Sequence, residues 1–177
     1  VTLVLDCAYD DLMMDKEVIS LCSQIGRCYA AMRSAACPPA GGLVMSSYGG
    51  RLADQIQQRL KTADRWRDVR WETASYDTLF SHDKLVYLSA DAETEVTALE
   101  PDKVYVIGGL VDKNRHKSLT HQRAVALGVT TARLPIDAYV RMTQRRVLTV
   151  NHVVEILLKW GQHRDWQQAF LDVIPAR

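Results

Sequence analysis

No stretch of the 177-residue chain approaches the roughly 20 consecutive apolar residues that a membrane-spanning helix requires. The apolar run at the N-terminus, Val1–Cys7, is too short for a signal peptide and is interrupted by Asp6. We therefore expect neither a membrane-embedded segment nor a membrane partner. The sequence starts with Val rather than Met, and we expect it to be a domain from which flanking extensions are absent.

Cysteine is sparse, and its spacing does not suit a metal site. The four cysteines all lie in the first quarter of the chain: Cys7, Cys22, Cys28 and Cys37. No two of them form a C-x-x-C pair and no histidine stands beside them, so we predict no zinc and no other bound metal. Reduced thiols in an intracellular protein are the expected state.

An excess of charge of one sign is also absent. The 22 Lys and Arg residues nearly balance the 21 Asp and Glu residues, which leaves a net charge of +1. A nucleic-acid-binding domain usually carries a basic excess. If this chain binds RNA, its positive charge must therefore be clustered, or be supplied by segments outside the sequence.

The pattern of apolar residues is typical of an α/β domain with a mostly parallel sheet. The predicted strands are Val1–Asp6, Leu43–Ser46, Val69–Glu72, Leu85–Leu88, Val104–Ile107 and Thr131–Leu134. The predicted helices are Asp15–Met32, with Asp15 as the N-cap, then Arg51–Lys61, Thr120–Leu127, Thr149–Trp160 and Trp166–Val173. Since there is no repeat and no low-complexity linker, we predict a single domain over residues 1–177.

Segment 104–117, VYVIGGLVDKNRHK, follows a buried strand and carries several polar groups. A Gly-Gly pair at a strand end lets a ligand lie against bare backbone, and ligands of open α/β sheets bind beyond such ends. Asp112 and the basic residues after it suit acid–base chemistry on a polyanion. A tight turn followed by a solvated helix start fits the same residues, and composition alone does not decide. A generic nucleotide-binding domain is disfavoured, because the third glycine of G-x-G-x-x-G and a phosphate loop are missing.

Segment 141–151, RMTQRRVLTVN, places three arginines before an apolar run that opens a helix. Arginines and helix N-terminal N–H groups both suit anions. A basic surface loop with Thr149 or Asn151 as the helix cap explains the segment equally well, and the residues by themselves favour that simpler interpretation.

Taken together, the strings LVYLSAD, YVIGGLVDKNRHK, ARLPI and RRVLTVNHV resemble the tRNA guanine-9 N1-methyltransferases of the SPOUT superfamily. The opening LVLDCAYDDLMMDKE, the segment SSYGGRL and the closing RDWQQAF fit the same family, so the resemblance spans essentially the whole chain. It implies a SPOUT-type α/β fold with a C-terminal trefoil knot that binds S-adenosyl-L-methionine and releases S-adenosyl-L-homocysteine. It also implies a monomer that acts on tRNA in the nucleus, the cytoplasm or both.

Carried over residue by residue, the resemblance assigns Asp112 as the general base that accepts the guanine N1 proton. It assigns the donor-binding residues as Leu88, Ser89, Gly108, Asp112, Lys113, Asn114, Arg115, His116, Leu134, Val147, Leu148 and Thr149. The tRNA backbone contacts that we expect are Lys113, Arg115, Lys117, Arg141, Arg145 and Arg146.

Two alternatives remain open. The chain could be a tRNA-binding or scaffolding subunit that retains the knot but has lost turnover. It could also methylate N1 of adenine at the same position of the tRNA. Adenine N1 carries no proton, so a base at Asp112 would then be unnecessary.

Overall fold

The computed structural model describes residues 1–112, 115–116, 118–139 and 148–174. Its centre is a six-stranded sheet in the order β3-β2-β1-β5-β4-β6, and every pair of neighbouring strands is parallel. The strands are β1 (Thr2–Asp6), β2 (Leu43–Ser46), β3 (Val69–Trp71), β4 (Leu85–Leu88), β5 (Val104–Gly108) and β6 (Thr130–Ala132). The predicted parallel α/β sheet is confirmed.

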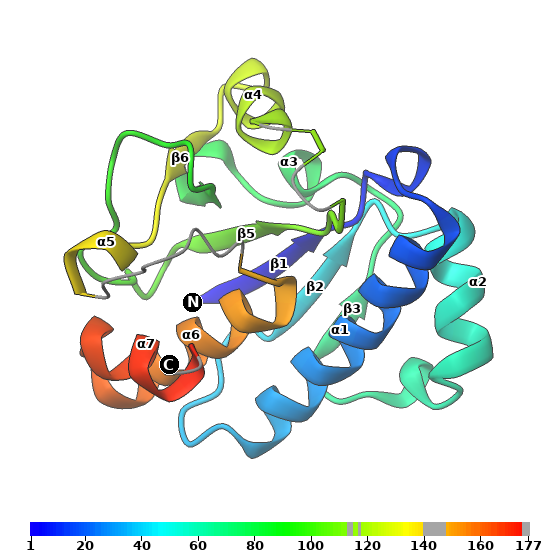
Figure 1. The fold of residues 1–177 in the computed structure, drawn as a ribbon, viewed down its shortest axis with the longest axis horizontal. Coiled ribbons are helices and arrows are strands. Elements are labelled where there is room, and N and C mark those ends of the chain that lie inside the picture. Colours follow the sequence, from blue (N-terminus) through cyan, green and yellow to red (C-terminus); the bar gives the residue numbers. More distant parts are fainter. Residues whose placement is uncertain (113–114, 117, 140–147, 175–177) are drawn as a thin grey trace.

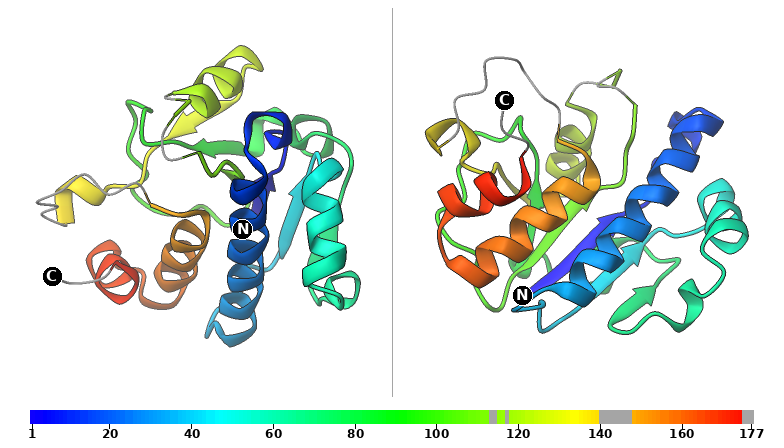
Figure 2. Two further views of the ribbon diagram at one scale, coloured as in Figure 1. Left: turned by 45° about the vertical axis from the view of Figure 1, so that its right-hand side comes forward. Right: turned by 60° about the horizontal axis from the view of Figure 1, so that its bottom comes forward.

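Helices cover both faces of this sheet (Figures 1 and 2). The elements are α1 (Asp15–Ser34), α2 (Gly50–Arg59), α3 (Tyr76–Leu79), α4 (Leu119–Ala126), α5 (Ile136–Tyr139), α6 (Val150–His163), α7 (Trp166–Val173) and the short 3-10 helices Asp10–Leu12, Ala63–Arg65 and His82–Lys84. On one face α2, α1 and α6 lie side by side, and α7 packs on α6. Helices α3 and α4 pack on the opposite face.

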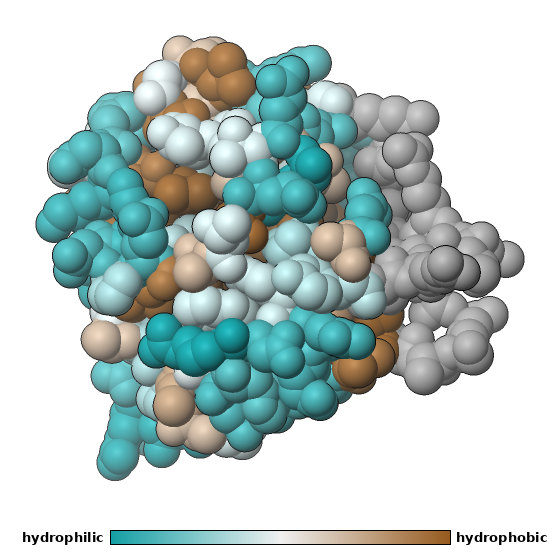
Figure 3. Space-filling view, turned by 90° about the vertical axis from the view of Figure 1, so that its left-hand side faces the viewer, coloured by the Kyte–Doolittle hydropathy of each residue, from teal (hydrophilic) through white to brown (hydrophobic). Residues whose placement is uncertain are grey.

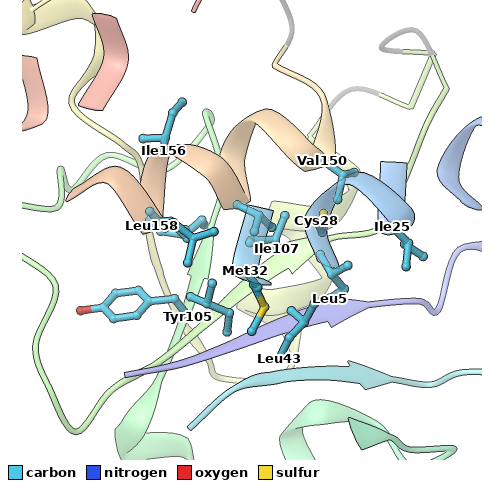
Figure 4. Close-up of a cluster of buried hydrophobic side chains, with 14 of the residues drawn as sticks. Leu5, Ile25, Cys28, Met32, Leu43, Tyr105, Ile107, Val150, Ile156 and Leu158 are labelled. Atoms are coloured by element: carbon cyan, nitrogen blue, oxygen red, sulfur yellow. The ribbon is translucent and has the colours of Figure 1, made fainter. Parts of the chain in front are cut away.

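The two faces hold two separate apolar cores, because successive strand side chains point to opposite sides. On β1, Leu3 and Leu5 join the larger core beneath α1, α2, α6 and α7, whereas Val4 joins the smaller core beneath α3 and α4. In the larger core, side chains of α1, β5 and α6 converge, among them Cys28 and Ile107 (Figure 4). The strands are therefore held rigidly from both sides, and their ends can place side chains accurately.

The observed elements differ from the predicted ones at several points, among them the start of α1, the end of β6 and the helix α5. Asp15 is the first residue of α1 rather than its N-cap, because Met14 holds that position and its N–H donates to Glu17 Oε1 at 2.7 Å. The strand predicted up to Leu134 ends at Ala132. The short helix α5 after Pro135 was not predicted.

The N-cap of α6, in contrast, is Thr149, one of the two predicted caps, whose hydroxyl accepts from the N–H of His152 at 3.4 Å. The predicted trefoil knot concerns the C-terminal part of the chain, of which residues 140–147 lie outside the described residues. The knot and the single-domain assignment therefore stay predictions.

Among the described residues, no helix combines the length and the apolar character needed to cross a membrane. On the face drawn in Figure 3, hydrophobic side chains form separate groups among hydrophilic ones. The large hydrophobic side chains that are exposed are Met14 at the start of α1, Val125 and Leu127 at the end of α4, Tyr139 in α5 and Leu171 in α7. Single exposed side chains of this kind are ordinary on a protein surface.

Candidate functional site at the carboxyl edge of the sheet

Three of the segments predicted to bind a ligand lie at one edge of the sheet. Leu88 and Ser89 end β4, Gly108 ends β5, and Leu134 lies just beyond β6. These three strands are neighbours in the order β5-β4-β6. The N–H of Ser89 donates to the carbonyl of Ala132 at 2.9 Å and ties two of the strand ends together. The structure thus brings these segments together where open α/β sheets bind their ligands.

The Gly-Gly pair packs directly against the end of β1. Gly108 is paired with Asp6 across the sheet, and the N–H of Gly109 donates to the Asp6 carbonyl at 2.8 Å. A Cβ on Gly109 would lie 2.7 Å from that same carbonyl oxygen. The chain therefore turns away from β5 so close to neighbouring backbone that position 109 has no room for a side chain.

A buried polar cluster lies beneath this turn on the α3–α4 face. The carboxylate of Asp6, 3% exposed, accepts from the hydroxyl of Tyr87 at 2.8 Å, and the hydroxyl of Tyr9 lies 2.9 Å from that of Tyr87. Burial raises the pKa of Asp6, and the hydrogen bonds from the two tyrosines oppose that rise. Local sequence patterns do not indicate this cluster, because Tyr87 lies 81 residues from Asp6 and 78 residues from Tyr9.

Asp112, the predicted general base, lies in the loop that follows Gly109 and is 7% exposed. Its Oδ2 accepts from the backbone N–H of His116 at 2.8 Å and lies 2.9 Å from Nδ1 of the same residue. The N–H of Arg115 donates to the Asp112 carbonyl at 3.1 Å. The carboxylate is therefore held in a defined position within a tight turn, as a proton-accepting group requires.

Arg115 points to the protein rather than away from it. Its Nη1 and Nη2 lie 2.7 and 2.9 Å from the two carboxylate oxygens of Glu17, and Nη2 donates to the Leu12 carbonyl at 3.0 Å. The hydrogen bonds from Arg115 lower the pKa of Glu17 to about 2. The predicted contacts of Arg115 with the donor and with tRNA stay predictions.

Leu148 and Thr149 stand directly before α6, and the N–H of Val150 donates to the side-chain oxygen of the buried Gln24 at 2.9 Å. Leu134 and Leu148 are half-buried and pack against the larger core. Helix α1 thus makes polar contacts with two of the predicted ligand-binding segments, through Glu17 at its start and Gln24 two turns later.

The other predicted site residues lie outside the described residues: Lys113, Asn114, Lys117, Arg141, Arg145, Arg146 and Val147. Within the part of the chain that the structure describes, no group of three or more His, Cys, Asp or Glu side chains is arranged to hold a metal ion. The chemistry visible at this edge is that of one held carboxylate beside half-buried apolar side chains and close-packed backbone.

Comparison with known proteins gives a consistent result. The whole sequence, residues 1–177, matches the family described as tRNA (guanine(9)-N(1))-methyltransferase TRM10/TRM10A. A Schizosaccharomyces pombe protein named tRNA (guanine(9)-N1)-methyltransferase is 47% identical over 180 residues, which cover 100% of this chain and 59% of the relative. The chain spans between 51% and 62% of the length of the fungal relatives that it matches.

Solved structures agree with the sequence match. The crystal structure of spTrm10(74) superposes with a TM-score of 0.93 at 47% identity and covers 98% of this chain and 94% of its own. The crystal structure of the full-length spTrm10–SAH complex gives a TM-score of 0.91 at 46% identity, with the same coverage of 98% and 94%.

Proposed function

The chain belongs to the tRNA (guanine(9)-N(1))-methyltransferase TRM10/TRM10A family, and from that premise we propose that it transfers a methyl group from S-adenosyl-L-methionine to N1 of guanine 9 in tRNA. The observation that carries this proposal is the position of Asp112, a buried and oriented carboxylate in the loop after the Gly108–Gly109 turn. Methylation of guanine at N1 requires that N1 lose its proton. Asp112 is the residue that we propose as the acceptor of this proton.

The expected donor site consists of the ends of β4 and β5, the residues after β6 and the start of α6. Leu134 and Leu148 supply half-buried apolar surface for an adenosine, and the strand ends supply backbone groups for its polar atoms. The S-adenosylhomocysteine complex of the spTrm10 relative supports this choice of donor. When bound, S-adenosylmethionine supplies a methyl group on a positively charged sulfur. The neutral thioether that remains after transfer is a good leaving group.

The chain itself supplies orientation and proton acceptance. The turn from Asp112 to His116 holds the carboxylate, while Glu17 and Gln24 on α1 support the segments on either side. As the bond from the methyl carbon to N1 forms and the carbon–sulfur bond breaks, the N1 proton passes to the Asp112 carboxylate. That carboxylate acts best if it lies within hydrogen-bond reach of N1 in the complex.

For tRNA binding we propose that basic residues of the segments 113–117 and 141–146 contact backbone phosphates while the target base leaves its stack. They are Lys113, Lys117, Arg141, Arg145 and Arg146, together with flanking segments outside the sequence. Such contacts make affinity strongly salt-dependent. We also propose the trefoil knot, a monomeric state and a location in the nucleus or cytoplasm, as the family resemblance implies.

Labelled methyl transfer to an unmodified tRNA transcript tests the proposal, with transcripts that carry G or A at position 9. Incorporation into the G9 transcript and not the A9 transcript is the expected result. Incorporation into the A9 transcript would show that the chain methylates adenine at this position. Donor binding without transfer to any tRNA, with the flanking segments restored, would support the scaffolding alternative.

A further inference from the structure

Glu17 is a buried acidic residue that the acid–base chemistry proposed above does not use. Its side chain is 4% exposed, and both of its carboxylate oxygens bind the guanidinium of Arg115, at 2.7 and 2.9 Å. This bidentate geometry is a strong arrangement for an arginine and a carboxylate, and it fixes the orientation of the guanidinium as well as its distance from the carboxylate. The ion pair joins positions 98 residues apart in the sequence.

The Glu17 end of this pair is immobile. Glu17 Oε1 also accepts the N–H of Met14 at 2.7 Å and so closes the first turn of α1. The next residue, Val18, and Leu21 one turn later are buried in the larger core, at 1% and 0% exposure. A group bound to Glu17 is therefore held against the rigid body of the domain.

The Arg115 end belongs to the turn that carries Asp112. The N–H of Arg115 donates to the Asp112 carbonyl at 3.1 Å, and its Nη1 lies 3.5 Å from the same oxygen. The neighbouring N–H of His116 donates to the Asp112 carboxylate at 2.8 Å. One contact chain therefore runs from α1 through the guanidinium of Arg115 to the proposed proton acceptor.

We propose that Glu17 is a positioning residue for methyl transfer, because it anchors Arg115 and thereby holds Asp112 in register with the donor and the target base. The inference rests on the proposed methyltransferase function. It assigns Arg115 to the geometry of the turn instead of a tRNA phosphate, which was the role expected from the sequence. Nη1 binds Glu17, and Nη2 binds Glu17 and the Leu12 carbonyl, so a phosphate that bound these two nitrogens would have to compete with those partners.

Three variants of the chain separate the two roles of Arg115: Glu17→Gln, Arg115→Gln and the double variant. Glu72→Gln is the matched control, because Glu72 forms an ion pair with Arg70 at 3.1 Å beside β3, at the far side of the sheet. Two measurements are made on each. The first is amide hydrogen exchange of the peptide that contains Asp112, Arg115 and His116. The second is kcat and KM for the G9 transcript.

If Glu17 positions the turn, Glu17→Gln and Arg115→Gln both raise exchange in that peptide, and Glu72→Gln does not. Both lower kcat by about 10- to 100-fold, the size of effect that a displacement of about 1 Å produces, with KM for tRNA unchanged. The double variant is no slower than the slower single variant, because the two side chains act as one unit.

If Arg115 instead binds a phosphate, Arg115→Gln raises KM for tRNA and reduces the slope of log affinity against log salt by about 1, while Glu17→Gln leaves kcat at the wild-type value. That result overturns the inference, and so does unchanged hydrogen exchange in Glu17→Gln. A wild-type chain that methylates no tRNA even with the flanking segments restored refutes the proposed function separately, and the exchange comparison still decides whether Glu17 holds the turn.

Discussion

The hydroxyl of Tyr87 donates a 2.8 Å hydrogen bond to the buried carboxylate of Asp6, although the two residues lie on strands β4 and β1 that are separated by β5. The Tyr87 side chain crosses β5 next to Gly108. A Cβ added at Gly108 would lie 3.2 Å from the Tyr87 hydroxyl oxygen. The close packing of the Gly108–Gly109 turn and the buried polar cluster are therefore parts of one arrangement at the end of the sheet.

Replacement of Tyr87 by Phe should destabilise the fold by about 1.5–3 kcal/mol at a pH where Asp6 is ionised, the usual contribution of a hydrogen bond to a charged group. Burial already raises the pKa of Asp6 above its ordinary value of 3.8, and the Tyr87 hydrogen bond lowers it, so the variant raises it further. A raised acid pKa in the folded state means that stability falls as the pH rises above 3.8.

The cost of Tyr87→Phe should therefore be larger at a pH where Asp6 is ionised in the folded protein than at a pH where it is protonated, because the Tyr87 hydroxyl favours the ionised form. Urea unfolding at pH 7, 5 and 4 measures this. Tyr105→Phe is a suitable control, because the Tyr105 hydroxyl accepts a backbone N–H, from Glu100 at 2.8 Å. If Tyr87→Phe and the control both lower the free energy of unfolding by an amount that does not change with pH, the hydrogen bond to Asp6 is not the cause of the loss.

The two glycines of the turn should respond differently to alanine. At position 109 the new Cβ would meet the Asp6 carbonyl at 2.7 Å, and a backbone atom cannot easily move. At position 108 it would meet the Thr120 methyl group at 3.0 Å and the Tyr87 hydroxyl at 3.2 Å, both of which are ends of side chains. We expect Gly109→Ala to cost about 1–3 kcal/mol, as overpacking does, and Gly108→Ala clearly less. Thermal unfolding of both variants would refute this if the order were reversed.

The ion pair between Glu17 and Arg115 should make stability sensitive to acid. Arg115 lowers the pKa of Glu17 from its ordinary 4.5 to about 2. A depressed acid pKa contributes stability that is fully present above pH 4.5 and is lost as the pH falls toward 2. The stability difference between wild type and Glu17→Gln should therefore be constant from pH 7 to about pH 5.5 and close below pH 4.5. Denaturant unfolding at pH 7, 5.5 and 3 checks this, and a gap that persists unchanged at pH 3 would contradict it.

Local patterns predicted the sheet and its main helices well. Val104–Ile107 and Leu85–Leu88 are nearly continuous apolar runs, as strands covered on both faces must be, and both are strands in the structure. Helix α7 has the predicted bounds Trp166–Val173. The error at Asp15 arose because several acidic residues precede the helix, and the N–H of Met14 is satisfied by Glu17, inside the helix, instead.

The site was predictable in part, and for a physical reason. Gly108, Gly109 and Asp112 are close together in sequence at a strand end, so a local pattern indicates them. Glu17 and Tyr87 act on the site through partners 98 and 81 residues away, and only the fold brings them there. Glu17 in particular resembles any first-turn acidic residue of a surface helix, and its 4% exposure is a property of the packed structure.

Single-turnover methyl transfer to the G9 tRNA transcript, measured for wild type and Asp112→Asn with saturating donor, tests the central claim most directly. An asparagine keeps the shape of the side chain and an oxygen for the N–H of His116, so the variant should fold and bind the donor as wild type does. If Asp112 accepts the N1 proton, the rate falls by about 10²- to 10⁴-fold. A variant that methylates G9 at the wild-type rate would contradict the role of Asp112 on which the account depends.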